Sequence, residues 1–463
     1  MSERQRASGG SVGRDGNSLE RIFKAYDVRG VVPDELDAGT TRRIGAAFAR
    51  VVATPAVVVG HDMRPSSPEL AAAFAEGVRA NGSDVVLIGL ASTDMLYFAS
   101  GHLDMPGAMF TASHNPAKYN GIKMCRSGAR PIGQDTGLAE IRELAGGGDL
   151  PTGPARGRER TADLLGDYAR YLRTLVDVSA IRPLTVVVDA ANGMAGHTAP
   201  AVFADTPIDV VPLYFELDGT FPNHEANPLE PANLRDVQAM VREVGADCGL
   251  AFDGDADRCF VVDERGEPVS PSALTALTAT RELARHPGAT VIHNLITSRA
   301  VPEIVREHGG VPVRTRVGHS FIKAEMARTG AVFGGEHSAH FYFRDFWFAD
   351  SGMLAALHTL AALGHADLPL SRLMAEFERY AASGEVNSTV ADQAASLAAV
   401  ERAYAGRPGV ELDRLDGVTV SGPDWWFNVR PSNTEPLLRL NCEAPDAAAM
   451  AALRDEVLAV IRA

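Results

Sequence analysis

Three aspartates and one arginine lie within six consecutive residues, at Asp253, Asp255, Asp257 and Arg258. The segment separates the apolar runs 249–252 and 259–262, which predicts a loop between two strands. Alternate side chains of an extended chain point to the same face, so the three carboxylates can converge. Because clustered carboxylates repel one another, their predicted centre is a divalent cation with oxygen ligands, and Mg²⁺ is the first candidate. The loop therefore predicts metal-assisted chemistry, with Arg258 holding an anion beside the metal.

This acidic loop has two alternative interpretations. A calcium-binding loop also carries alternating acids, and Glu264 stands eleven positions after Asp253. The sixth position of such a loop needs a glycine for its sharp turn, however, and Arg258 stands there. A solvated acidic turn is also disfavoured, because the flanking runs are apolar enough to be buried strands. The magnesium site remains the favoured interpretation.

A second polar segment, residues 111–116, follows an apolar strand predicted at 107–110. Open α/β sheets bind ligands at the carboxyl ends of their strands, and Ser113 falls at such an end. A serine in this position is a candidate nucleophile for phosphoryl transfer, with His114 or Lys123 as the group that handles the proton. The alternative is an ordinary Ser/Thr-rich turn that is closed by an Asn-Pro pair.

Two later loops carry polar groups that suit a sugar and a phosphate. The first follows the apolar run 331–333, and its alternate residues carry polar side chains that could contact sugar hydroxyls, namely Glu336, Ser338 and His340. The second lies between two predicted strands and offers an arginine fork with neutral donors, from Arg430, Ser432, Asn433 and Thr434. Each loop on its own could also be an ordinary polar turn. Their occurrence together with the serine and aspartate loops favours a single site for an anionic sugar.

The composition is that of a large, acidic, globular protein. The chain has 463 residues, of which 46% are hydrophobic, so it can form several domains with buried cores. Its formal net charge of -15 argues against nucleic acid or an anionic membrane as the main partner. An anionic substrate must therefore be bound by local groups of arginine and lysine.

The cysteines indicate a reducing compartment, and the N-terminal segment does not resemble a secretory signal. The four cysteines are widely scattered and form neither a metal-binding spacing nor a disulfide framework. Residues 1–19 are rich in glycine, serine and charge, lack the apolar core of a secretory signal, and are expected to be a disordered tail. No apolar stretch approaches the roughly 20 residues that cross a bilayer. We expect a cytoplasmic protein without a membrane span.

One unit of strand, helix and strand recurs three times. Its paired Val/Ile-rich strands are predicted at 56–60 and 84–88, at 184–189 and 208–213, and at 290–294 and 311–314. Strands that alternate with helices of this length favour parallel or mixed sheets covered on both faces. After about residue 380 strands predominate, which indicates a smaller α+β domain whose last helix begins after an N-cap at Asp446.

The predicted fold class is α/β, with four domains around a central cleft. The first three domains repeat a mixed α/β sheet, and the C-terminal domain is a smaller α+β unit. Each domain supplies one of the chemical loops. The predicted ranges are a tail at 1–19, a serine-loop domain at 20–160, a metal-loop domain at 161–266, a sugar-loop domain at 267–375 and a phosphate-loop domain at 376–463.

Taken in this order, the four loops resemble the signature loops of the α-D-phosphohexomutase superfamily, and most closely its bacterial phosphomannomutase/phosphoglucomutase type. The resemblance implies that Ser113 carries the phosphoryl group and binds Mg²⁺ together with Asp253, Asp255 and Asp257. It also implies that Glu336 and Ser338 hold the sugar 3- and 4-hydroxyls. The loop that binds the substrate's own phosphate matches Arg430, Ser432, Asn433 and Thr434. Further residues fall on positions that line the family's cleft, namely Tyr26, Arg29, Lys123, Arg258, His319 and His340.

The resemblance implies an isomerase that interconverts mannose 6-phosphate and mannose 1-phosphate, with glucose phosphates as further substrates. The implied intermediate and activator is a hexose 1,6-bisphosphate, and the enzyme is expected to be a monomer or homodimer. Lys123 is the preferred general base, with His114 and His319 as alternatives. A phosphoglucosamine mutase is the main alternative function, and a sugar-phosphate-binding protein without catalysis is another. The sequence departs from some relatives at 294–297, where it offers no cleft lysine.

Overall fold

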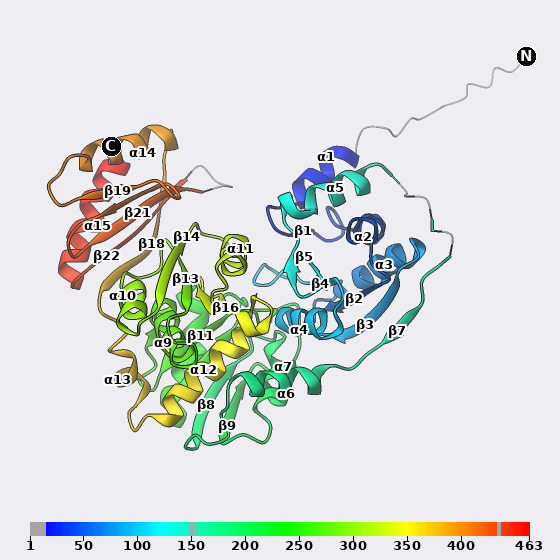
Figure 1. Cartoon of the computed structure of the whole chain (residues 1–463), viewed down its shortest axis with the longest axis horizontal. Coiled ribbons are helices and arrows are strands. Elements are labelled where there is room, and N and C mark those ends of the chain that lie inside the picture. Colours follow the sequence, from blue (N-terminus) through cyan, green and yellow to red (C-terminus); the bar gives the residue numbers. More distant parts are fainter. Residues whose placement is uncertain (1–14, 149, 151, 154, 433–436) are drawn as a thin grey trace, which may run out of the picture.

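The computed structural model describes residues 15–463 except 149, 151, 154 and 433–436. Within that part, three mixed α/β sheets are followed by one antiparallel sheet, as the sequence predicts. In Figure 1 the first domain lies at the upper right, the second and third lie below, and the C-terminal domain lies at the upper left. The described residues contain no helix that is both long and apolar enough to cross a membrane.

The first sheet has the strand order β1-β5-β4-β2-β3-β7, with the short β6 on β5. Its strands are β1 (Val28–Val31), β2 (Ala56–His61), β3 (Asp84–Leu90), β4 (Gly107–Phe110), β5 (Tyr119–Arg126), β6 (Arg130–Pro131) and β7 (Glu159–Thr161). The helices beside it are α1 (Asp15–Ile22), α2 (Ala38–Val52), α3 (Ser67–Ala80), α4 (Thr93–Leu103) and α5 (Leu138–Gly146). Strands β2, β3 and β4 are fully apolar at their centres, because helices cover both faces of the sheet.

The second and third sheets each have five strands in the described part of the chain. The second runs β12 (Pro268–Val269), β11 (Cys259–Asp263), β10 (Cys248–Phe252), β8 (Leu184–Asp189) and β9 (Ile208–Leu213), with helices α6 (Leu165–Leu175), α7 (Ala195–Phe203) and α8 (Arg235–Val244). The third runs β14 (Val311–Thr315), β13 (Thr290–Asn294), β15 (Phe333–Gly335), β16 (Phe341–Phe343) and β17 (Ala349–Asp350). Its helices are α9 (Pro271–Arg285), α10 (Ala300–Glu307), α11 (His319–Thr329), α12 (Gly352–His365) and α13 (Leu370–Met374).

All three mixed sheets share one pattern of four strands. The orders β5-β4-β2-β3, β11-β10-β8-β9 and β16-β15-β13-β14 correspond strand for strand, with the same parallel and antiparallel pairs. In each sheet the first of these strands turns back antiparallel against the second. The connecting turns are 111–118, 253–258 and 336–340, which are the predicted serine, metal and sugar loops. The repeat therefore places three chemical loops at equivalent points of three sheets.

The C-terminal sheet is antiparallel and has its own core. Its order is β18 (Ala381–Thr389), β22 (Leu437–Ala444), β21 (Trp426–Pro431), β20 (Val418–Ser421) and β19 (Glu411–Asp413), packed by α14 (Gln393–Tyr404) and α15 (Ala447–Ile461). The prediction of a helix cap is confirmed: Oδ1 of Asp446 accepts hydrogen bonds from the amides of Ala448 and Ala449, at 2.9 and 2.8 Å.

The hydrophobic cores divide the molecule differently from the sheets. One continuous core passes through all three mixed domains, as Val58, Val188 and Val291 illustrate. The C-terminal core is separate, and only a small cluster around Leu295 and Trp426 joins it to the third domain in the described structure. The first three domains therefore form one packed body, to which the fourth is attached by a thin interface.

Two elements lie near predicted domain boundaries. Strand β12 pairs with β11 across the hairpin turn at 264–267, so the second sheet continues to Val269. Helix α1 begins at Asp15, and Leu19 and Ile22 bury apolar side chains against the first domain. Residues 1–14 lie outside the described part.

Candidate active site

The serine loop and the aspartate loop meet directly. The hydroxyl of Ser113 donates to Oδ2 of Asp253 at 2.7 Å, although the two residues are 140 positions apart. Ser113 and Asp253 are both buried. The structure thus brings together the two loops from which the sequence predicted a phosphoryl group and a metal.

The three aspartates form a compact, buried group. Asp253, Asp255 and Asp257 each offer a carboxylate oxygen, and these oxygens all lie within 4.8 Å of one another. Two buried oxygens, Oδ1 of Asp255 and Oδ1 of Asp257, have no hydrogen-bond partner among the described residues. Buried carboxylate oxygens without donors are what a hard divalent cation requires, so this donor set fits Mg²⁺.

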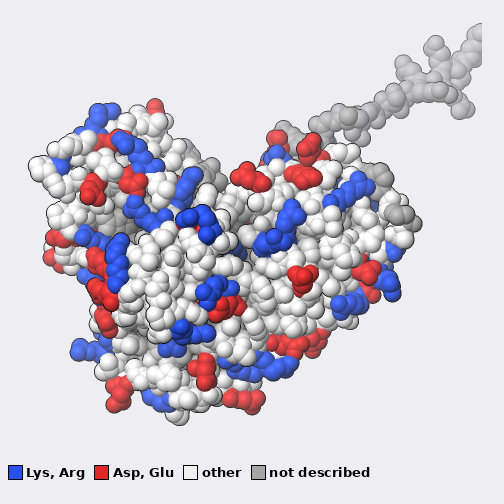
Figure 2. All heavy atoms as spheres, in the orientation of Figure 1, with Lys and Arg blue, Asp and Glu red and all other residues white. Residues whose placement is uncertain are grey.

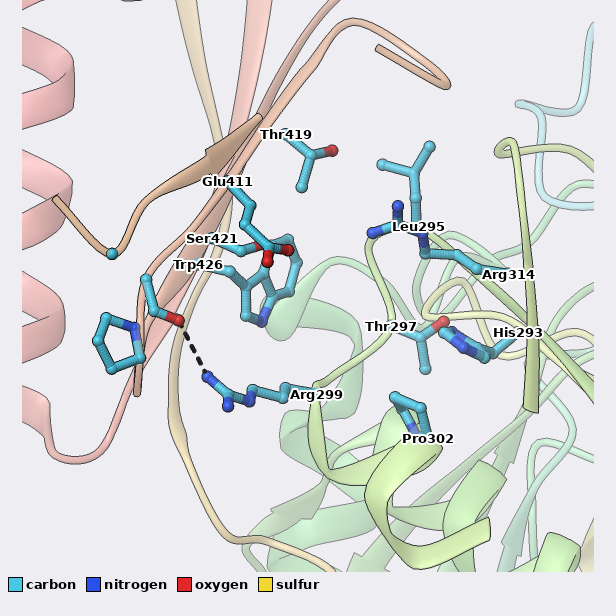
Figure 3. Close-up of a pocket in the computed structure, with 13 residues that line it drawn as sticks. His293, Leu295, Thr297, Arg299, Pro302, Arg314, Glu411, Thr419, Ser421 and Trp426 are labelled. Carbon is cyan, nitrogen blue, oxygen red and sulfur yellow. Dashed lines mark hydrogen bonds between the residues drawn. The ribbon is translucent and has the colours of Figure 1, made fainter. Parts of the chain in front are cut away.

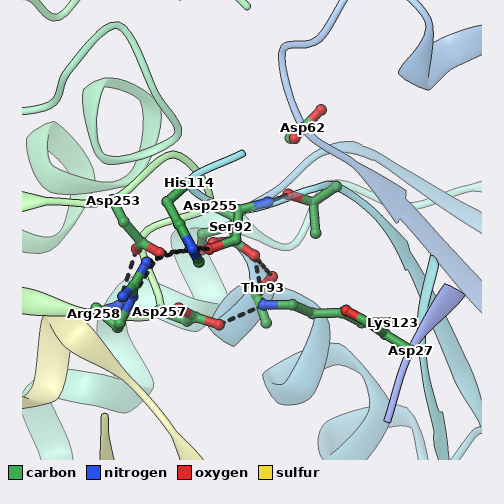
Figure 4. A network of polar contacts seen from close by, with 12 residues as sticks. Asp27, Asp62, Ser92, Thr93, His114, Lys123, Asp253, Asp255, Asp257 and Arg258 are labelled. Carbon is green, nitrogen blue, oxygen red and sulfur yellow. Dashed lines mark hydrogen bonds and ion pairs between the residues drawn. The ribbon is translucent and has the colours of Figure 1, made fainter. Parts of the chain in front are cut away.

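Lys123 supplies positive charge to the same group. Its ammonium donates to Oδ2 of Asp255 at 2.7 Å and to Oδ2 of Asp257 at 2.6 Å, as Figure 4 shows. Burial lowers the pKa of Lys123, but the two carboxylates outweigh burial and raise the pKa well above its usual value. In this arrangement Lys123 is a counterion of the two carboxylates. Its role as the general base stays a prediction.

The carboxyl groups of Asp253 and Asp255 differ in pKa. Burial raises the pKa of Asp253 to about 7, with a smaller contribution from the neighbouring acids and with Arg258 opposing the shift. Burial also acts to raise the pKa of Asp255, but the charge of Lys123 outweighs it, and the net shift is downward. Asp255 is therefore the more firmly ionised of the two.

Arg258 connects the acidic loop to His114. Its Nε lies 2.9 Å from Oδ2 of Asp253, and its Nη2 lies 2.6 Å from Nδ1 of His114, which is itself 3.1 Å from the hydroxyl of Ser113. Burial and the charge of Arg258 lower the pKa of His114 to about 2, so the ring is neutral. Because Arg258 can only donate, Nδ1 of His114 is the acceptor nitrogen, and His114 orients Arg258 rather than taking up a proton.

Close approach of the two loops depends on one glycine. A Cβ atom at Gly254 would lie 2.4 Å from the carbonyl oxygen of Ser113, which is far inside van der Waals contact. Ser113 itself has a φ of 49°, and Ala256 has a φ of 58°, so both loops contain a left-handed residue that is not glycine. The backbone of this site is therefore held in a conformation that the surroundings must stabilise.

A cavity of about 120 Å³ opens beside Ser113. Most of the residues that the sequence assigned to the cleft line it, namely Tyr26, Arg29, Ser113, His114, Lys123, Asp257, Arg258 and His340. Several of these side chains are cationic, which suits an anion in a protein that is acidic overall. The volume is that of a phosphoryl group with part of a ring, and is less than the roughly 300 Å³ of a site that encloses a whole small ligand.

His340 is held by residues that the sequence did not single out. Its Nδ1 lies 3.0 Å from Oδ2 of Asp350, and the ammonium of the buried Lys323 lies 2.7 Å from the other oxygen of Asp350. Burial lowers the pKa of His340, but Asp257 and Asp350 outweigh it and raise the pKa above its ordinary value. Lys323 and Asp350 belong to no recognisable motif, and only the pairing across β16 and β17 brings Asp350 beside the sugar loop.

Another residue missed from the sequence is Thr93, at the start of α4 in the first domain. Its hydroxyl donates to Oδ2 of Asp255 at 2.6 Å, and its amide donates to the carbonyl oxygen of Asp255 at 2.9 Å. The neighbouring Asp94 accepts hydrogen bonds from Tyr168 of the second domain and Ser351 of the third, at 2.7 and 2.6 Å. The start of α4 thus fixes a metal-loop carboxylate and joins three domains.

Glu336 and Ser338 lie on the same loop as His340 but not in the wall of the serine cavity. Glu336 is buried and accepts hydrogen bonds from Tyr342 at 2.5 Å and from Asn294 at 3.1 Å. Asn294, at the start of the segment where the sequence offers no cleft lysine, thus meets Glu336. Ser338 is half-buried in the turn that follows.

The described residues of the predicted phosphate loop, Arg430 and Ser432, do not line the cavity beside Ser113. Arg430 is buried; its Nη2 donates to Glu385 at 2.6 Å, while its Nη1 has no hydrogen-bond partner among the described residues. Nη2 of Arg439 lies 3.5 Å from the hydroxyl of Ser432. The predictions for Asn433 and Thr434, and for the side chain of His319, fall outside the described residues. Figure 2 shows a notch between the C-terminal and first domains, with lysine and arginine side chains near its floor.

Comparisons with known proteins agree with this architecture. Four family models, for domains I, II and III and the C-terminal domain of phosphoglucomutase/phosphomannomutase, match residues 20–149, 166–266, 270–380 and 385–460. A phosphohexose mutase of Xanthomonas campestris pv. campestris is 42% identical over 436 residues, covering 94% of this chain and 97% of the relative. A phosphomannomutase of Salmonella montevideo is 41% identical over 453 residues, covering 95% and 98%.

A solved structure extends the likeness to three dimensions. The phosphoglucomutase/phosphomannomutase family protein of Burkholderia thailandensis superposes with a TM-score of 0.87 at 35% identity, covering 95% of this chain and 97% of that one. Matches of this length include all four domains and every loop described above. The chain therefore belongs to the phosphoglucomutase/phosphomannomutase family of the α-D-phosphohexomutase superfamily, and it is a phosphohexose mutase, an isomerase.

Proposed function

We propose that this enzyme interconverts mannose 6-phosphate and mannose 1-phosphate, and acts on glucose phosphates as well, through a phosphorylated Ser113. The observation that carries the proposal is the 2.7 Å contact between Ser113 and Asp253 in a buried pocket with Arg258 and Lys123. Mannose is favoured because the Salmonella relative at 41% identity is a phosphomannomutase.

In the proposed reaction the bond between phosphorus and Oγ of Ser113 breaks while a bond forms between phosphorus and a free hydroxyl of the sugar phosphate. The hydroxyl loses its proton, and a hexose 1,6-bisphosphate results. The bisphosphate then reverses its orientation in the site, and its other phosphoryl group is transferred to Ser113. Arg258 neutralises the transferred group beside Asp253, and His114 keeps Arg258 oriented. His340, which Asp350 orients, is the imidazole that we propose exchanges the hydroxyl proton.

Asp253, Asp255 and Asp257 are the residues that we propose hold Mg²⁺, together with the phosphorylated serine. Bound there, the cation neutralises charge on the phosphoryl oxygens. Lys123 is then free of part of its ion pairing, and we propose that it interacts with the substrate or its phosphate. A hexose 1,6-bisphosphate activates the enzyme in this scheme, because it phosphorylates Ser113 when it gives up one phosphoryl group.

The substrate's own phosphate is proposed to bind Arg430, Ser432, Asn433 and Thr434, and its ring hydroxyls to meet Glu336 and Ser338. Tyr26, Arg29 and His319 complete this proposed cleft. Because Arg430 does not line the serine cavity, binding requires the C-terminal domain to rotate toward the first domain.

The interface between the third and C-terminal domains supports such a rotation. It encloses a cavity of about 420 Å³, shown in Figure 3, which separates the two sheets. The contacts across it combine the small apolar cluster around Leu295 and Trp426 with polar pairs. Among these pairs, the amide and the side chain of Arg299 donate to Glu443 at 2.9 Å and to the carbonyl oxygen of Gly422 at 3.4 Å, and Arg314 pairs with Asp413. An interface of this kind can slide or hinge without unpacking a core.

The decisive experiment compares the parent with Ser113→Ala in a coupled assay with mannose, glucose and glucosamine phosphates. Ser113→Ala should nearly abolish turnover, while Ser127→Ala, a nearby serine outside the cavity, should leave it intact. Intact mass spectrometry before and after hexose 1,6-bisphosphate and Mg²⁺ should place a phosphoryl group on Ser113. Turnover of Ser113→Ala within a few-fold of the parent would refute the proposed nucleophile, and a preference for glucosamine phosphate would refute the proposed substrate.

A further inference from the structure

Arg64 is a fully buried arginine beside the serine loop, and it takes no direct part in the reaction described above. It lies between β2 and α3, and its side chain is 0% exposed. A buried guanidinium needs partners for all of its N–H groups, because each unpaired donor in a dry interior is costly. The partners of Arg64 therefore show what the residue does.

Four of its N–H groups point into the serine loop. Nη2 donates to the carbonyl oxygens of Ser113 at 2.8 Å and Asn115 at 2.7 Å. Nη1 donates to the carbonyl oxygens of Pro116 at 3.0 Å and Tyr119 at 2.9 Å. One planar group thus holds four carbonyl oxygens of the turn that carries the reactive serine.

The fifth N–H group, on Nε, makes an ion pair with Oδ2 of Asp62 at 3.2 Å but no hydrogen bond among the described residues. The other oxygen of Asp62 accepts from the Arg64 amide at 2.9 Å and from the hydroxyl of Ser67 at 2.5 Å. The guanidinium carbon lies 5.1 Å from the centre of the Phe221 ring, which belongs to the second domain. Arg64 is therefore held on one side by its own strand end and on the other by the domain that carries the metal loop.

These contacts bear directly on Ser113. The carbonyl oxygen of Ser113 accepts a hydrogen bond from Arg64 and lies so near Gly254 that a Cβ there would come within 2.4 Å of it. Fixing that carbonyl restricts the ψ angle of a residue whose φ of 49° is unusual for a serine. The direction of the Ser113 side chain toward Asp253 follows from this backbone conformation.

We propose that Arg64 is a positioning residue for phosphoryl transfer: it shapes the serine loop from behind and aims Oγ of Ser113 at the metal loop. The proposal rests on Ser113 as the phosphoryl carrier. Lysine cannot replace Arg64, because an ammonium has three donors and no planar fork, so at least one of the four carbonyl oxygens loses its partner.

The test is Arg64→Lys in the full-length enzyme, with kcat and KM measured for mannose 1-phosphate. We expect kcat to fall on the order of 10- to 100-fold, because a small misplacement of a reacting atom has effects of this size, while KM changes less than about threefold. The matched control is Arg173→Lys. Arg173 also donates to main-chain carbonyl oxygens, those of Ala201 and Val202 at 2.9 Å, but lies outside the cavity.

A second measurement separates positioning from loss of folding. Phosphorus NMR of the phosphorylated enzyme should show a shifted or broadened phosphoserine resonance in Arg64→Lys, and the parental resonance in Arg173→Lys. If Arg64→Lys does not fold, Asp62→Asn is the variant to measure instead. It loosens the guanidinium of Arg64 but keeps the four contacts to carbonyl oxygens. The expected fall in kcat is then smaller, again without a matching change in KM.

The outcomes distinguish this proposal from the proposed function. A parent enzyme that never carries phosphate on Ser113 would remove the basis of both. A parent that is phosphorylated on Ser113, together with a folded Arg64→Lys or Asp62→Asn variant of parental kcat and parental resonance, overturns the role of Arg64 alone. A rise in KM at unchanged kcat also overturns it, since Arg64 would then act on substrate binding.

Discussion

Replacing Lys123 with methionine tests the electrostatics of the site most directly. Three buried carboxylates face two cations, Lys123 and Arg258, and the side chains of Asp255 and Asp257 are only 0% and 2% exposed. Removing one partner of a buried pair costs about 3–5 kcal/mol. Lys123 is itself 18% exposed, which favours the lower end of that range. The entropy of unfolding is about 2.1 cal/mol/K per residue, so a packed body of roughly 350 residues shifts by about 1.4 °C per kcal/mol, and Lys123→Met should lower the unfolding temperature on the order of 4 °C without metal.

Magnesium should reverse much of this loss. In the variant the cation meets two carboxylates that have lost their ammonium, whereas in the parent it must compete with Lys123. Saturation to about 100 times the dissociation constant contributes about 2.7 kcal/mol of stability. The rise in unfolding temperature between EDTA and saturating MgCl₂ should therefore be larger in Lys123→Met than in the parent.

Scanning calorimetry of both proteins in EDTA and in MgCl₂ measures these effects. The pH should be near 8, so that Asp253, whose pKa is about 7, is ionised. Lys118→Met, at an exposed lysine in the turn just before β5, is the control and should behave as the parent does. If Lys123→Met unfolds at the parental temperature in EDTA, or gains no more from magnesium than the parent gains, Lys123 is not the counterion of the metal loop.

Two further predictions concern a histidine and the domain motion. Burial lowers the pKa of His224, but the hydrogen bond and charge of Asp189, with smaller contributions from Glu225 and Asp236, together outweigh burial and raise the pKa above the ordinary value of about 6.5. The stability that this pair contributes is fully present below about pH 6.5 and is lost as the pH rises through the folded-state pKa. His224→Gln should therefore destabilise the protein more at about pH 6 than at about pH 9. Equal losses of stability in urea unfolding at both pH values would contradict this assignment. Rotation of the C-terminal domain should reduce the radius of gyration in small-angle X-ray scattering when hexose 1,6-bisphosphate is added, and an unchanged radius at saturation would argue against closure.

The sequence predicted the parts of the site that lie in continuous segments. Ser113 and Asp253 could be placed at strand ends because apolar runs precede them, and the repeat predicted that such ends belong to similar sheets. Arg64, Thr93 and Lys323 could not be found in this way. Each acts through a single side chain that follows no pattern, and its partner lies in another loop or another domain.

The partners of Lys123 were also beyond sequence reasoning. Lys123 lies in β5, two residues after an asparagine-glycine pair, and its type alone is compatible with a base, a substrate ligand or a counterion. Only the distances in the structure show that it pairs with both Asp255 and Asp257. Charge state depends on neighbours from the second domain, and the order of residues in the first domain contains no information about them.

The division into one rigid body and one attached domain suits the chemistry proposed for this enzyme. The three repeated sheets share a core, and their equivalent turns hold Ser113, the aspartates and His340. Phosphoryl transfer needs those groups at fixed distances, because small displacements slow the reaction greatly. The bisphosphate intermediate, by contrast, must turn end over end between the two transfers, which requires room and a loosened grip on its second phosphate. The C-terminal domain, which carries the proposed phosphate-binding residues, has its own core and only a thin interface with the third domain. It can therefore release and rebind that phosphate while the residues that transfer the phosphoryl group stay in place.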